Sequence, residues 1–407
     1  MRKLNALSVF LAFAFGAAAA CSSGSSSQPP GTSGPLFSSH AYKGHENDQD
    51  MNAFVTAFPL TVGTRLDDCQ TCHASATYTY ESDGATKSTS KNACDNCHLL
   101  QHPSPDFLEP QPSKYADTLN SFGAAYAAAG RSADALRAIA ANDSDRDGFS
   151  NQEEIDALKY PGDPASKPGQ PAAPSRLFAV DELKAMGAHS EFMLANSHKQ
   201  QYDNYATYVG VKVVDLLAAA GVDPSDAAIE GITVIAPDGY LKDFPAEQIR
   251  KAFPAGLFYA GLDSATLGPD CGFVQYPDSL PAGVTDGAPI PGEPWLLLAY
   301  ERDGLPLDPS NLDVTSGKIN GEGPLRIIVP QSSPDRPDRG SQYSPTNCND
   351  GHDYDSSKDH NAGAMVRGVI AVRVNPLPAG FEDFDYANGG WAYVDSESVL
   401  VYGYGIQ

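Results

Sequence analysis

Two short stretches, Cys69-Gln70-Thr71-Cys72-His73 and Cys94-Asp95-Asn96-Cys97-His98, decide how the first half of this chain is interpreted. Each stretch holds two thiols three positions apart and an imidazole directly after the second thiol. The segment 74–93 that separates them is short and hydrophilic, so we expect the two sets of side chains to lie close together. Because the cysteines and the histidine have the same spacing in both stretches, we expect both stretches to bind the same kind of cofactor or metal.

Both stretches resemble the haem-attachment motif of c-type cytochromes. The resemblance implies two haem c groups, with His73 and His98 as the proximal iron ligands and thioether bonds to four thiols: Cys69, Cys72, Cys94 and Cys97. Paired CxxC stretches at this separation also fit a structural zinc site, in which the histidines would be incidental. Haem is preferred because histidine follows both pairs at the same position.

The second, distal ligand of each iron is expected to be a histidine. The candidates are His40 and His102, followed by His45, while Met51 is the nearby thioether alternative. Methionine ligation raises the reduction potential of a haem. Histidines outnumber methionine in this region, so two low-potential haems with histidine on both sides are the preferred hypothesis.

Residues 143–154 resemble the twelve-residue calcium loop of an EF-hand. The resemblance implies oxygen ligands from side chains and one backbone carbonyl: Asp143, Asp145, Asp147, Phe149 (carbonyl), Asn151 and Glu154. Ser150 stands where paired EF-hands carry an aliphatic residue, and no second loop follows. A single Ca²⁺ that staples the fold is therefore expected, and an acidic turn without metal is the alternative.

The first residues have the pattern of an export signal over 1–20, with a basic start and an apolar run that ends in small residues. Cys21 then resembles the lipidated residue of a bacterial lipoprotein, and 21–36 would be a flexible tether. Ordinary signal cleavage that leaves Cys21 as a spare thiol is the alternative. The pattern predicts an outer-membrane lipoprotein, facing the periplasm or the cell surface, that contacts the lipid membrane through its acyl anchor.

The formal net charge of −24 argues against nucleic acid as a partner, and redox partner proteins are expected instead. Cys271 and Cys348 remain after the other cysteines are assigned. Export leads to an oxidising compartment, so a disulfide between these two residues is expected.

The segment 160–175 is rich in proline and glycine and is predicted to be a linker. Beyond it, 176–407 contains strand-like runs. Several motifs there resemble the sulfite-oxidase-like molybdopterin-binding domain: Gly210-Val211, Asp238-Gly239-Tyr240 and Gly323-Pro324-Leu325-Arg326. That family binds molybdenum through a cysteine ahead of the Gly-Val motif. This chain has no cysteine between Cys97 and Cys271, so bound molybdopterin is not expected.

These observations predict a multidomain fold class. A small, mostly α c-type cytochrome region with the EF-hand-like loop would occupy 37–159. A larger α+β, strand-rich, sulfite-oxidase-like domain would occupy 176–407. The expected function is electron transfer by a membrane-anchored dihaem protein rather than catalysis. The alternatives are a molybdopterin-dependent oxidoreductase that reduces its own haems and a ligand-binding protein that uses haems as sensors.

Overall fold

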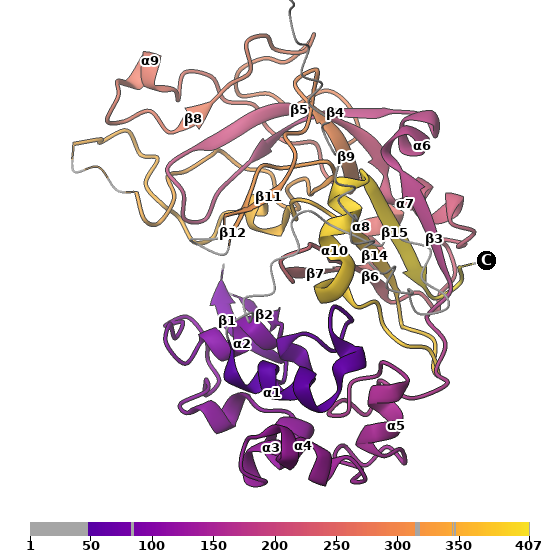
Figure 1. Ribbon diagram of the computed structural model, residues 1–407. Helices are drawn as coiled ribbons and strands as arrows, with labels where there is room; N and C mark the ends of the chain where they lie inside the picture. The colour runs from indigo at the N-terminus through magenta and orange to yellow at the C-terminus, as the bar shows by residue number, and fades with distance from the viewer. Residues whose placement is uncertain (1–47, 83–84, 314–317, 344, 346, 407) are drawn as a thin grey trace, which may run out of the picture.

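The computed structural model describes residues 48–82, 85–313, 318–343, 345 and 347–406 (Figure 1). The expected export signal, the tether, Cys21, His40 and His45 lie outside the described residues. In the part that is described, no helix is long and apolar enough to cross a membrane.

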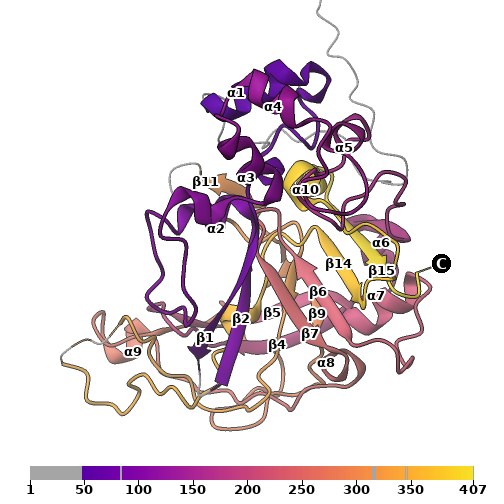
Figure 2. The same ribbon diagram turned by 90° about the horizontal axis from the view of Figure 1, so that it is seen from below.

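The N-terminal part, drawn in indigo to magenta, lies at the lower end of the molecule in Figure 1, and in Figure 2, seen from below, some of it overlaps the C-terminal part. Its elements are α1 (Gln49–Ala57), β1 (Ala76–Ser82), β2 (Ala85–Lys91), α2 (Ala93–His98), α3 (Ser121–Ala128), α4 (Ala133–Ile139) and α5 (Asn151–Asp156). Single 3-10 turns lie at Pro59–Thr61, Cys69–Thr71 and Tyr115–Thr118. Phe54, Phe122 and Leu136 are almost fully buried at the centre of a separate apolar core in this part.

The predicted fold class is wrong, because the chain is a mixed α/β protein and no mostly α cytochrome region is present among the described residues. Strands β1 and β2 form an antiparallel hairpin within 74–93, which was expected to be only a hydrophilic connection. The segment alternates threonine, serine and tyrosine, which favours a strand with one face on the protein. Tyr78 is buried, and its ring stacks on Phe107 with the ring centroids 4.7 Å apart.

The C-terminal part contains two larger sheets. One has the order β10-β9-β5-β4, with β13 on β9 and β8 on β5, and the other has the order β3-β15-β14-β6-β7. The first is built from β4 (His189–Ala195), β5 (Asp203–Lys212), β8 (Val274–Gln275), β9 (Leu297–Arg302), β10 (Leu305–Pro306) and β13 (Arg326–Ile328). The second is built from β3 (Ser175–Ala179), β6 (Gly231–Ile235), β7 (Leu241–Pro245), β14 (Ala371–Asn375) and β15 (Ser398–Gly403). Strands β11 (Asn311–Asp313) and β12 (Lys318–Asn320) form a separate pair.

One apolar core joins these two sheets. It takes Tyr208 and Leu298 from the first sheet and Val372 and Val399 from the second, all fully buried. Short helices complete the part: α6 (Val180–Ala185), α7 (Val213–Ala219), α8 (Ala246–Arg250), α9 (Ser264–Leu267) and α10 (Tyr386–Asp395), with a 3-10 turn at Asn361–Ala364. Figure 1 shows α10 on the side of the C-terminal part that faces the N-terminal part.

The two parts are joined by an ion-pair network at that face. Arg65 donates to Glu382 at 2.6 Å and to Asp385 at 2.9 Å. Lys159 also pairs with Glu382. The Tyr160 hydroxyl donates to Asp385 at 2.8 Å. Because all these charged side chains are at most 15% exposed, each depends on its partners for solvation.

We expect Glu382→Gln to lower the free energy of unfolding by about 2–4 kcal/mol, because it leaves two buried cations with too little negative charge. Burial alone would raise the pKa of Glu382, but Arg65 and Lys159 hold it below its usual range. Denaturant titration of the full chain measures the change. The exposed Glu397→Gln is the matched control, and equal stability of the two variants would contradict this account of the network.

Candidate functional site

The first cysteine-histidine stretch forms one tight helical turn. Asp68 begins this turn by accepting the Gln70 N–H at 2.9 Å. The N–H groups of Cys72 and His73 both donate to the carbonyl of Cys69, at 3.1 and 2.9 Å. Residues three apart in a helical turn lie on one face. Both thiols therefore project from the same side, and the imidazole follows directly.

The second stretch lies on α2. Asn92 caps this helix by accepting the Asp95 N–H at 2.8 Å, and its amide also donates to the carbonyl of Asp238 in the C-terminal part at 3.3 Å. Cys94 and Cys97 are again three positions apart on one helical turn, with His98 as its last residue. The two stretches thus have the same local geometry, although their flanking segments differ.

The two stretches are in contact with each other. The thiols of Cys69 and Cys94 are hydrogen-bonded, and this contact together with burial raises the pKa of Cys94. The Thr118 hydroxyl also bridges the stretches. It lies 2.9 Å from Nδ1 of His73 and beside the Cys97 thiol, whose pKa burial raises and this hydroxyl lowers. Groups attached at the two stretches would consequently be neighbours.

Both ring nitrogens of His73 have a hydroxyl neighbour. Nδ1 lies 2.9 Å from the Thr118 hydroxyl, which donates to the carbonyl of Tyr115 at 2.8 Å. Nε2 lies 3.2 Å from the Tyr115 hydroxyl, which donates to Asp50 at 3.4 Å. Burial lowers the pKa of His73, which favours the neutral ring. A neutral imidazole binds a metal through the ring nitrogen that carries no proton.

The remaining axial-ligand candidates lie in different surroundings. His98 is exposed at the end of α2, and His102 is exposed one helical turn further on. Met51 is buried in the same apolar cluster that Cys72 joins. Met51, the less favoured candidate for a distal ligand, therefore lies near the first cysteine-histidine stretch. His102 lies at the surface, beyond the second stretch.

The donor set of these two stretches fits covalently attached haem: paired thiols on one helical face, followed directly by a histidine. It does not fit a four-thiolate zinc site equally well. Among the described residues, the one group of three or more possible ligands whose atoms all lie within 4.8 Å is Asp143, Asp145 and Asp147. The four thiols therefore do not gather at one tetrahedral centre.

Those three aspartates lie in the loop between α4 and α5, and Glu154 follows on α5. Glu154 is fully buried, and neither of its carboxylate oxygens has a hydrogen-bond partner in the described chain. Burial and the neighbouring carboxylates raise the pKa of Glu154 to about 9 and that of Asp145 to about 6. Oxygen donors held this close repel one another unless a cation lies between them, and so they fit Ca²⁺.

Asn151 has a different contact from the one its position in the loop suggests. Its Oδ1 accepts the Ser144 N–H at 3.2 Å and its Nδ2 donates to the Ile139 carbonyl at 2.8 Å. The side chain therefore closes the loop against α4. A cation at this site would rely on the other oxygens, including the Phe149 carbonyl that the sequence pattern implies.

Two charged residues near the loop were missed by the sequence analysis. Asp163 acts electrostatically on both Asp145 and Glu154, and the Lys167 ammonium lies 3.6 Å from Asp147. Both follow the loop in the segment that was predicted to be a linker. Asp163 is the single acid of 160–164, which follow the loop closely in sequence, whereas nothing in the pattern pointed to Lys167.

The structure joins Cys271 and Cys348 by a disulfide across 77 positions, with their Cα atoms 5.6 Å apart. Arg339 lies beside it, fully buried, and donates to the Cys271 carbonyl at 2.6 Å. The bridge ties the polar segment after Pro330 to the loop that precedes β8.

Comparison with known proteins gives no match to a family model, to a curated protein or to a solved structure.

Removal of bound cation should make stability strongly dependent on pH. In the cation-free chain the pKa of Glu154 rises from 4.5 to about 9 on folding, so this group's contribution to stability is lost as pH rises through that interval. Added Ca²⁺ should raise the melting temperature by roughly 2–5 °C, and by more at high pH, because it compensates the ionised carboxylates.

Thermal unfolding with and without chelator, at several pH values, measures this effect. Glu154→Gln should abolish most of the response to calcium. Asp134→Asn, which removes a carboxylate exposed on α4, should retain it. If the melting temperature changes neither with chelator nor with pH, the loop is a metal-free acidic turn.

Proposed function

We propose that this chain is a dihaem c-type electron-transfer protein. The observation that carries the proposal is the pair of matching helical turns, in contact with each other, that each present two thiols on one face with a histidine next in sequence. Haem iron would supply one-electron redox chemistry at both turns. Two haems held this close together would exchange electrons rapidly.

The side chains have separate tasks in this proposal. Cys69 and Cys72 would hold one haem, and Cys94 and Cys97 the other. His73 would bind iron through Nε2, with Thr118 fixing the ring, and His98 would serve the second haem. The distal ligands remain a choice among His40, His102, His45 and Met51.

An electron carrier is favoured over a molybdenum enzyme. Soft metals such as molybdenum need thiolate ligands. The two cysteines of 176–407 are bonded to each other, so that region offers no free thiol. The C-terminal part would then have a structural role and support the haem-bearing part.

We also propose that Ca²⁺ occupies the loop at 143–154 as a structural staple, supported by the buried, unpartnered carboxylate of Glu154. For the whole chain, sequence features support an exported lipoprotein of the outer membrane, anchored through an acyl group on Cys21. Its partners would be redox proteins, and its surface charge favours those with a basic face.

Full-length protein produced with the cytochrome c maturation machinery should contain two iron atoms and two covalent haems, with no molybdenum or zinc. Cys69→Ala with Cys72→Ala should remove one haem, and Cys94→Ala with Cys97→Ala the other, because each haem depends on its own pair of thiols. Intact mass, a haemochrome spectrum and metal analysis measure the result. Cys271→Ser with Cys348→Ser is the control and should keep both haems.

Colourless protein with one zinc per chain would overturn the proposal in favour of a structural metal site. About one molybdenum per chain would instead support the enzyme.

Thr118→Val should raise the reduction potential of one haem by on the order of tens of millivolts. It removes the acceptor for the His73 Nδ1–H and so makes the ring a weaker electron donor to iron. Thr61→Val is the matched control: Thr61 is equally buried and its hydroxyl also donates to a carbonyl three residues back. A redox titration in which both variants behave alike would assign Thr118 a purely structural role.

A further inference from the structure

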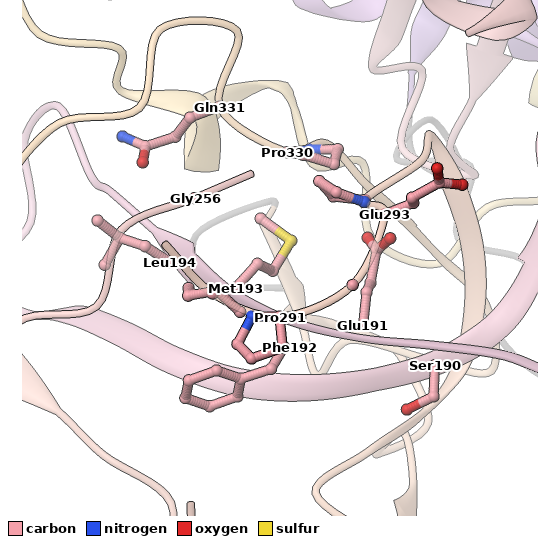
Figure 3. Close-up of a pocket in the computed structure, with 13 residues that line it drawn as sticks. Ser190, Glu191, Phe192, Met193, Leu194, Gly256, Pro291, Glu293, Pro330 and Gln331 are labelled. Carbon is pink, nitrogen blue, oxygen red and sulfur yellow. The ribbon is translucent and has the colours of Figure 1, made fainter. Parts of the chain in front are cut away.

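A hollow lies along β4, at the edge of its sheet and far along the chain from the cysteine-histidine stretches (Figure 3). It is open to solvent, and the space in and in front of it measures about 410 Å³ with that solvent included. Much of its wall is apolar, formed by Phe192, Met193, Leu194, Ile290, Pro291 and Pro330. A largely apolar hollow with a few fixed polar groups is the usual form of a small-molecule site.

The carboxylate of Glu191 is the charged group buried in this wall. Glu191 is 6% exposed, and its Oε2 accepts the Trp295 N–H at 2.9 Å and lies 3.5 Å from Nε2 of His189. Its Oε1 is buried and has no hydrogen-bond partner among the described residues. Burial raises the pKa of Glu191, and the contacts with His189 and the Trp295 N–H act in the opposite direction.

Two further polar groups extend this pattern. Glu293 is exposed at the rim, and Figure 3 shows its carboxylate on the same side of the hollow as that of Glu191. Gln331 lies on the opposite side and is 3% exposed. Its amide nitrogen donates to the Asp359 carbonyl at 3.0 Å, which leaves its Oε1 buried and unpartnered. Both buried, unpartnered atoms of the lining residues are therefore hydrogen-bond acceptors.

We propose that this hollow binds a small organic cation, a primary ammonium or guanidinium group on a short carbon chain. The cationic head pairs with Oε1 of Glu191, and the carbon chain lies against Phe192, Met193 and the prolines. A bare metal ion suits the hollow less well, because hard cations need several oxygen ligands and the wall offers one buried carboxylate.

The test is a calorimetric titration of the full-length, haem-loaded protein with n-butylammonium, with n-butanol and butyrate as neutral and anionic probes of the same length. The unmodified protein should bind n-butylammonium in preference to both. Glu191→Gln should weaken that binding at least tenfold, since it removes a buried charge-assisted hydrogen bond. Glu293→Gln should weaken it about two- to threefold, because a rim charge is screened by water.

Glu230→Gln, which changes an exposed carboxylate elsewhere in the same part of the chain, is the matched control and should bind as the parent does. Near-UV circular dichroism checks that each variant is folded, and the preference for the charged probe in the unmodified protein needs no variant at all. Equal binding of the three probes, no binding of n-butylammonium, or its displacement by calcium would each overturn the proposal. None of these outcomes bears on the haems.

Discussion

Tyr160 lies at the centre of the contacts that fix the two parts of the chain to one another. Its ring is 1% exposed and belongs to the N-terminal apolar core, while its hydroxyl donates to Asp385 of the C-terminal part. The Arg65 guanidinium lies over the ring, 4.5 Å from its centroid, and also pairs with Asp385. A buried ring with a polar tip can join an apolar core to an ion-pair network, which neither a purely apolar nor a charged residue does.

This anchor places the acidic loop close to the join. Glu154 precedes Tyr160 by six positions, and the N–H of the intervening Lys159 donates to the Glu154 carbonyl at 2.7 Å. Asp163 and Lys167 return from the same segment towards the loop carboxylates. The charge state of the loop is therefore connected, through a few ordered residues, to the contact between the two parts. A cation there would stabilise the geometry of the join as well as the loop itself.

The proposed redox groups lie in the smaller part, and its own core is modest. Phe54, Phe122 and Leu136 form its centre, and many of the segments around the cysteine-histidine stretches are polar or irregular. Thioether bonds attach a large cofactor without requiring an equally large apolar pocket, which suits such a part. The hollow proposed to bind an organic cation lies instead on the larger part, beside the edge strand β4. The haem sites would depend on covalent bonds to thiols, whereas this hollow depends on the packing of the larger part.

Sequence alone determined the local features: the repeated spacing of the two cysteine-histidine stretches, the acidic loop and the remaining pair of cysteines. These depend on neighbours within a few positions or on covalent chemistry, so the pattern contains the information. The tertiary structure decided the hairpin β1–β2, the role of Tyr160, the bridging position of Thr118 and the burial of Glu191. Each of these depends on contacts between residues distant in the sequence, such as Tyr78 with Phe107 or Tyr160 with Asp385. Spacing along the chain cannot specify such contacts, because their free energy comes from burial that exists only once the chain has folded.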